Sequence, residues 1–205
     1  NNSHLTAEHE EWRAQLRRFF DREVIPFADQ WDEDGALPDE LWPKAAAVGI
    51  LGLGYPEEFG GVSEGIDIWH KNILNEELAR IAVGGLSATL MVHGIGLPPV
   101  LNFASEAIKQ EVAPPVLAGT KRISLAITEP GAGSDVAHLT TTARLDGDHY
   151  VVNGSKTYIT GGMKANWFTT AVRTGGEGSS GVSTLLIPAD TEGVSRTALD
   201  KKQGW

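Results

Sequence analysis

Apolar residues near the start of the chain recur at steps of three and four, the spacing of one face of an α-helix. The clearest stripe runs from Trp12 to Trp31, opposite a charged face, and is typical of a helix packed on a core. Thr6 is placed to cap the helix start, Pro26 should kink or divide the helix, and Asp34-Gly35 should end it. The stripe consists of Trp12, Leu16, Phe20, Val24, Phe27 and Trp31.

Helical periodicity continues as far as Gly119. Ser105 is expected to cap the last helix of this part, and Gly84-Gly85 to break the chain between two helices. Glycines and prolines in residues 49–61 predict an ordered loop. The further helices are predicted at residues 38–48, 67–82, 86–103 (interrupted near residues 94–99) and 106–117.

After Gly119 the pattern changes from helical to alternating, which indicates strands. The sequence therefore predicts an α+β protein, with an N-terminal α-helical bundle over residues 1–120 and a β-barrel or sandwich domain over residues 121–205. Strands are expected at residues 123–127, 167–173 and 183–188, with a flexible loop at residues 175–181 and hairpin turns at Asp146-Gly147 and Asn153-Gly154.

Composition narrows the class of protein further. Hydrophobic residues make up 41% of the chain and charged residues 21%, as in ordinary globular proteins. The 27 acidic residues outnumber 17 basic ones, and a net charge of -10 argues against nucleic-acid or anionic-membrane binding. We expect no membrane insertion, since no apolar run is long enough, and a cytoplasmic location, which the lack of cysteine and of a targeting segment fits.

A glycine-rich turn follows the first predicted strand. In Thr128-Glu-Pro-Gly-Ala-Gly-Ser-Asp135, the proline lacks an N–H and the glycines permit unusual backbone angles. The resulting turn should expose N–H groups beside the hydroxyls of Thr128 and Ser134, an arrangement that can hold a polar ring or a pyrophosphate. No Lys-Ser/Thr pair follows, and the third glycine of the dinucleotide fingerprint is missing, so neither common phosphate-binding motif is present.

This turn, followed by Asn153-Gly-Ser-Lys-Thr-Tyr-Ile-Thr-Gly161, closely resembles the acyl-CoA dehydrogenase family. Earlier segments resemble that family's N-terminal helical domain, and all matches occur in the family's order. These segments are Ile25-Pro-Phe-Ala28, Gly49-Ile-Leu-Gly52, Pro56-Glu-Glu-Phe-Gly-Gly61 and Glu77-Leu-Ala-Arg80.

The resemblance implies FAD-dependent α,β-dehydrogenation of an acyl-CoA thioester to the trans-2-enoyl-CoA. It also implies a C-terminal helical domain, absent from this sequence, that carries the family's glutamate base. No residue here is therefore assigned as catalytic, and this chain alone is expected to be inactive. The implied partners are acyl-CoA, an electron-transfer flavoprotein or similar acceptor, and further copies in a dimer or tetramer.

By the same resemblance, the strand and turn should line the flavin and residues 158–160 should form a second wall. Thr128 should bond the pyrimidine edge of the ring, and Thr160 the flavin N5. Ser134 should also border the acyl-CoA channel. Many relatives carry Trp at the position of Tyr158. The full set of cofactor-binding residues is Leu125, Ala126, Ile127, Thr128, Gly133, Ser134, Tyr158, Ile159 and Thr160.

Other chemistry-bearing residues are interpreted as structural. Glu129 and Asp135 flank the turn and could form an acid/base pair, but short polar side chains commonly bond turn N–H groups. The six histidines show no metal-ligand spacing. The alternatives are an acyl-CoA oxidase or flavin monooxygenase of the same fold, disfavoured by Thr128-Glu-Pro130, and a non-catalytic assembly module that lacks the base.

Overall fold

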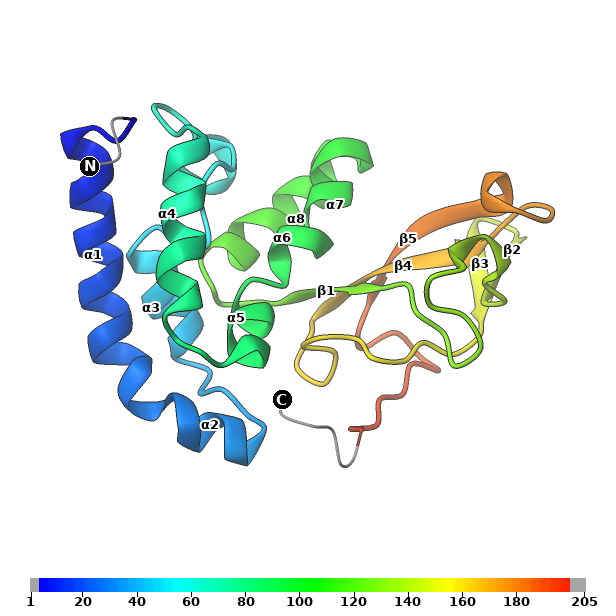
Figure 1. The fold of residues 1–205 in the computed structure, drawn as a ribbon. Helices are drawn as coiled ribbons and strands as arrows, with labels where there is room; N and C mark the ends of the chain where they lie inside the picture. Colours follow the sequence, from blue (N-terminus) through cyan, green and yellow to red (C-terminus); the bar gives the residue numbers. More distant parts are fainter. Residues whose placement is uncertain (1–3, 200–205) are drawn as a thin grey trace. The chain divides into compact units, whose positions relative to one another are not determined.

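The computed structural model describes residues 4–199, and the chain forms two compact units (Figure 1). The described part of the helical unit comprises residues 4–91 and 110–121. The sheet unit comprises residues 92–109 and 122–199. Residues 92–109 thus group with the sheet, although they are largely helical and precede residue 120.

The helical unit begins with the predicted amphipathic stripe, divided as Pro26 requires. Helix α1 (Ala7–Glu23) is followed by the 3-10 turn η1 (Ile25–Phe27) and helix α2 (Ala28–Asp34), which ends at left-handed Gly35. Leu16, Phe20 and Val24 are fully buried, whereas Phe27 is half exposed and stacks on Trp31. The 3-10 turn changes the helical phase, and this removes Phe27 from the buried stripe.

The remaining helices of this unit differ from the expected bounds mainly at glycines and prolines. Helix α3 (Leu41–Ala47) begins three residues after Pro38, and α4 (Ile68–Ala79) begins after its cap, Asp67. The prediction for Gly84-Gly85 was wrong, because this pair starts helix α5 (Gly84–Leu90). The break lies before it, where Ala82 has a positive φ of 61°. Helix α8 (Glu106–Leu117) has the predicted bounds.

No single helix among residues 4–199 is long and apolar enough to cross a membrane. The apolar stretch predicted as one interrupted helix is divided into α5, α6 (His93–Gly96) and α7 (Pro98–Phe103).

The strands of residues 4–199 form a single five-stranded mixed sheet, with the order β1-β4-β2-β3 and β5 paired to β4 (Figure 1). Strand β4 is central, since it pairs in parallel with β1 and, at one residue, with β2, and antiparallel with β5 along its whole length. The strands are β1 (Ile123–Ala126), β2 (Thr142–Asp146), β3 (His149–Asn153), β4 (Trp167–Arg173) and β5 (Val182–Pro188).

Only one of the two expected hairpin turns forms. Strands β2 and β3 pair as predicted, with Asp146 opposite His149. Asn153-Gly154 instead ends β3, and the chain continues without regular structure to β4, so the second hairpin prediction was wrong. Gly154 packs against Thr141, where a Cβ would lie 2.6 Å from the threonine Cα. This close approach, rather than a turn, explains the glycine.

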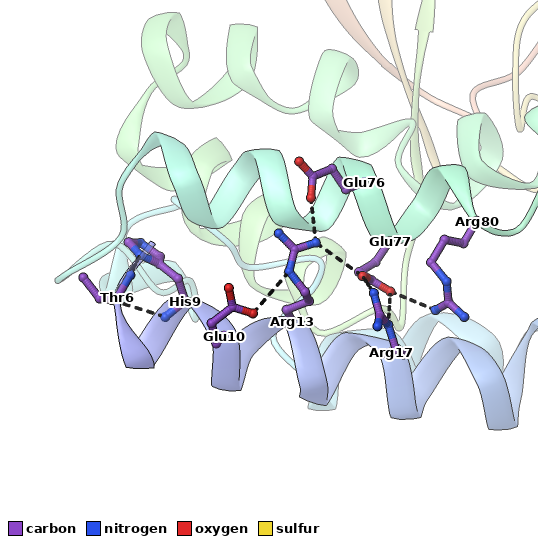
Figure 2. A network of polar contacts seen from close by, with 8 residues as sticks. All are labelled: Thr6, His9, Glu10, Arg13, Arg17, Glu76, Glu77 and Arg80. Atoms are coloured by element: carbon purple, nitrogen blue, oxygen red, sulfur yellow. Dashed lines mark hydrogen bonds and ion pairs between the residues drawn. The ribbon is translucent and has the colours of Figure 1, made fainter. Parts of the chain in front are cut away.

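A buried carboxylate joins the charged faces of α1 and α4. The side chain of Glu77 on α4 is 1% exposed and accepts from Arg17 on α1 at 2.6 Å and from Arg80 at 2.8 Å (Figure 2). Arg13 on α1 lies 3.5 Å from Glu77 and donates to Glu76 at 2.6 Å. Burial by itself raises the pKa of Glu77, but bonds from Arg17 and Arg80 outweigh it and lower that pKa. Part of the charged face of α1 therefore packs against α4 and does not face solvent alone.

Candidate functional site

The first site segment, residues 123–134, is strand β1 and the glycine-rich turn after it. The turn closes at Glu129 and Ala132, whose main chains exchange hydrogen bonds of 2.8 and 3.2 Å. Neither Gly131 nor Gly133 has a positive φ, so unusual backbone angles do not explain these glycines. A Cβ at Gly131 would meet no atom within 4 Å, and Gly133 and Ser134 are exposed. The absence of side chains leaves the main chain of this turn uncovered.

The second site segment, residues 156–162, contains an unusual backbone conformation. Tyr158 has a φ of 56°, in the left-handed region that non-glycine residues seldom adopt, and it is 73% exposed. Such strain persists only where surrounding contacts fix it, and it is concentrated at functional sites. Just beyond, Gly162 N–H donates to the Ile159 carbonyl at 2.9 Å and closes a turn.

Hydrogen bonds at both ends hold the two segments side by side. Thr157 N–H donates to the Thr128 carbonyl at 2.9 Å, and Ser124 Oγ donates to the Thr160 carbonyl at 2.8 Å. The segments therefore run in opposite directions, with residue 128 beside 157 and residue 124 beside 160. The structure thus brings together the two stretches predicted to line one site, although they lie about thirty residues apart in the sequence.

Glu129 is tied to three residues in two other parts of the sheet unit. Its carboxylate accepts from the N–H groups of Thr140 at 2.7 Å and Thr141 at 2.8 Å, and from Lys156 Nζ at 2.9 Å. Burial by itself raises the pKa of Glu129, but bonds from Thr141, Thr140 and Lys156 outweigh it and hold that pKa well below its usual range. A carboxylate so bonded stays ionised and does not exchange protons near neutral pH.

The suggested acid/base pair is not formed in the sheet unit. Glu129 is buried, whereas Asp135 is exposed and paired with exposed His138, with 2.7 Å between Asp135 Oδ2 and His138 Nδ1. Glu129 does bond N–H groups, as expected for a structural role. Those groups belong to residues 140 and 141, however, and not to the adjacent turn.

The sequence alone did not predict that Lys156 joins the two segments. Its ammonium donates to the Ile127 carbonyl at 2.8 Å and to Glu129, and its side chain is only 11% exposed. The lysine is part of the motif that suggested the family, but a single lysine beside a predicted strand gives no sign of burial. Its partners lie 27 and 29 residues away, so sequence spacing could not have found them.

Two histidines and an aspartate of the helical unit also meet, which the sequence did not predict. Asp67 Oδ1 lies 3.0 Å from His9 Nε2 and 2.9 Å from His70 Nδ1, close enough for the three side chains to share a metal ion. His9 Nδ1, however, accepts from Thr6 N–H at 3.0 Å, so the proton of neutral His9 lies on Nε2 and points to Asp67. That nitrogen has no free lone pair for a metal.

These three side chains act instead as helix caps. Thr6 and His9 form a capping box on α1, and Asp67 and His70 form one on α4. The bond between His9 and Asp67 then links the two helix starts. Five main-chain N–H groups, those of Thr6, His9, Asp67, Trp69 and His70, find acceptors in this way, which is the common need of a helix N-terminus.

Two family models together match nearly the whole chain. The family model described as "Acyl-CoA dehydrogenase, N-terminal domain" matches residues 6–120, and "Acyl-CoA dehydrogenase, middle domain" matches residues 124–205. The mitochondrial isobutyryl-CoA dehydrogenase of Dictyostelium discoideum is 33% identical over 98% of this chain and 48% of its own length. The chain thus spans about half the length of this curated relative.

Solved structures give the same result. A probable acyl-CoA dehydrogenase from Mycobacterium abscessus superposes with a TM-score of 0.86 and 45% identity, covering 92% of this chain and 50% of that one. An acyl-CoA dehydrogenase from Bacillus anthracis complexed with FAD superposes with a TM-score of 0.85 and 31% identity, covering 98% of this chain and 34% of that one.

Proposed function

The chain belongs to the acyl-CoA dehydrogenase family, and we propose that the complete protein uses FAD to convert an acyl-CoA thioester into its trans-2-enoyl-CoA. The observation that carries the proposal is the pairing of the two site segments, through Thr157 with Thr128 and through Ser124 with Thr160. These are the two stretches whose motifs suggested a flavin site.

The residues present fit a bound FAD. The uncovered turn at Gly131 and Gly133 allows close approach of a pyrophosphate to main-chain N–H groups, which favour anions. Tyr158 is exposed and held in a fixed backbone conformation, so its ring can pack on a flat ligand. A hydrogen bond joins the main chains of Thr128 and Thr157. A ring system would therefore lie against the paired segments and not between these two residues.

Within that site, we assign the hydroxyls of Thr128 and Thr160 to polar atoms of the isoalloxazine ring, and Gly133 and Ser134 to the pyrophosphate. Ser134 also borders the acyl-CoA. Leu125, Ile127 and Ile159 would supply apolar contact, whereas the buried side chain of Ala126 would contribute through its main chain. FAD, when bound, supplies the hydride acceptor.

None of the carboxylates near the two segments is assigned as the base that removes the α proton. Glu129 is kept ionised by its bonds, which also occupy both of its oxygens, and Asp135 is paired with His138. We propose that this base is a glutamate of the C-terminal domain typical of the family. We also propose that the electron acceptor is an electron-transfer flavoprotein or a similar protein. The complete protein would assemble into dimers or tetramers and be located in the cytoplasm.

The test is to express the complete gene, purify the protein with its flavin and add acyl-CoA substrates of increasing chain length in the absence of oxygen. Loss of the oxidised-flavin absorbance with at least one substrate, and dye reduction at the same rate, is expected. A flavin that no acyl-CoA bleaches contradicts the proposal and favours a non-catalytic module. Rapid peroxide formation when oxygen is admitted favours an oxidase.

A further inference from the structure

Lys156 makes the contact that fixes where the second site segment begins. Its ammonium reaches two acceptors on the first segment, the Ile127 carbonyl at 2.8 Å and Glu129 Oε1 at 2.9 Å. Both partners of the ion pair are nearly buried, with side-chain exposures of 11% and 4%. Bonds between buried charged groups are stronger and more directional than exposed ones, so this contact constrains geometry.

The constrained residues are those proposed to hold the cofactor. Ile127 and Thr128 directly precede Glu129 in the sequence, and Tyr158 lies two residues after Lys156. The bond from Thr157 N–H to Thr128 lies immediately beside it. Tyr158 adopts a left-handed conformation that a free chain would leave, so neighbouring contacts must maintain it. Lys156 on the preceding side and the turn of residues 159–162 on the following side are the contacts in place to do so.

We propose that Lys156 is a positioning residue of the flavin site, which holds the second segment against the first with Glu129 as its counter-charge. This inference rests on the proposed function. The ammonium of Lys156 donates to the Ile127 carbonyl and to Glu129, so the lysine acts through Ile127, Thr128 and Tyr158. Because the two charges of the pair are opposite, their effects on the flavin potential largely cancel, whereas either charge alone would shift it.

Loss of one partner should therefore have two separable consequences. Lys156→Met leaves the negative charge of Glu129 uncompensated beside the flavin, which opposes electron uptake and shifts the midpoint potential to more negative values. It also releases the second segment. The double variant Glu129→Gln with Lys156→Met removes both charges, so its potential should return toward that of the wild type while the segment stays loose.

The experiment uses the complete protein in five forms: wild type, Lys156→Met, Lys156→Arg, the double variant and Lys109→Met. The last is a matched control, because Lys109 pairs with exposed Glu106 at 2.7 Å outside the two segments. The dissociation constant for FAD and the flavin midpoint potential are measured for each. Hydrogen exchange of the residue 157 amide is measured on the FAD-free proteins.

We expect Lys156→Met to weaken FAD binding roughly tenfold or more and to accelerate exchange at residue 157 by a similar factor. Lys156→Arg should restore most of the affinity, and Lys109→Met should match the wild type. Unchanged affinity, potential and exchange in Lys156→Met would overturn the inference. If Lys156→Met does not fold, the double variant decides: wild-type exchange at residue 157 in that protein also overturns it.

A failure of the proposed function gives a different pattern. In that case the wild type binds no FAD, and the exchange comparison alone tests whether Lys156 holds the second segment. Wild-type FAD binding together with unaffected Lys156 variants leaves the proposed function standing and rejects the positioning role.

Discussion

Glu77 of the helical unit and Glu129 of the sheet unit are both buried carboxylates with lowered pKa values, but their surroundings differ. Glu77 lies among arginines that reach solvent, with side-chain exposures of 19% for Arg13, 49% for Arg17 and 36% for Arg80. Among residues 4–199, the cation paired with Glu129 is the nearly buried Lys156, and the other donors are threonine N–H and hydroxyl groups.

The Glu77 contacts stabilise the packing of two helices, whereas the Glu129 contacts stabilise the candidate site. The Glu77 contacts join two regular helices at a face where water can still solvate the cations, so the helices retain their own packing without it. The Glu129 contacts join a turn, the approach to a strand and an irregular segment, none of which has a hydrogen-bonding ladder of its own. A site assembled from irregular segments depends on its buried polar bonds more heavily than a helix pair does.

The largest effect is expected at Glu129. Glu129→Ala leaves the Lys156 ammonium and two threonine N–H groups without their acceptor, and a buried charge deprived of its partner costs about 3–5 kcal/mol. Urea denaturation of the complete protein measures this free energy of unfolding. Asp135→Ala is the control, since that carboxylate is exposed, and it should change stability by less than about 0.5 kcal/mol. A cost at Glu129 no larger than the control's would show that the pair is not structural.

Glu77→Gln should have a smaller effect, about 1–3 kcal/mol, because the arginines left behind can be hydrated. It should also leave the dissociation constant for FAD unchanged, unlike variants of Lys156. Glu76→Gln is the matched control on the same helix, since Glu76 is exposed and accepts only from Arg13 among the contacts drawn in Figure 2. If Glu77→Gln destabilises more than Glu129→Ala, solvent access to the cations is not what distinguishes the two carboxylates.

The elements could be predicted where local signals were sufficient. Pro26 and the period of three and four gave α1 and α2, and the bounds of α8 and β4 were correct. The errors came at glycines, because a glycine pair can start a helix, as at Gly84, as well as end one. At Gly154 the glycine serves a close approach to Thr141, which depends on tertiary structure and leaves no local pattern.

For the site, the informative signal was the family motif, and the family membership that it implied is confirmed. Periodicity alone gave Thr128 and Thr160 no special status. The roles of the nine proposed cofactor residues stay predictions. The contacts of Lys156 and of His9 with Asp67 were missed because they join residues 27 to 58 positions apart. Side-chain contacts between residues so far apart in the sequence follow from the fold, which has to be known first.

A third carboxylate, Glu57, sharpens the contrast because it is well bonded but exposed. It accepts from Ser63 Oγ at 2.7 Å and from the N–H groups of Ser63 and Glu64, and these bonds lower its pKa from 4.5 to about 2. A carboxylate with a lowered folded pKa stabilises the protein above its unfolded pKa and loses that contribution as the pH falls toward the folded value.

The stabilising effect of Glu57 should therefore be complete above pH 4.5 and disappear as the pH falls to about 2. In Glu57→Gln, the denaturation midpoint should be slightly lower than that of the wild type at pH 6, and the difference should shrink as the pH falls toward 3. Glu58→Gln, on the same exposed turn, is the control for the loss of one exposed carboxylate, and at pH 6 Glu57→Gln should lower the midpoint more than this control does. If the difference in denaturation midpoint between Glu57→Gln and the wild type stays constant from pH 6 to pH 3, the hydrogen bonds of this exposed carboxylate do not stabilise the protein. Burial would then be what makes a bonded carboxylate matter in this protein.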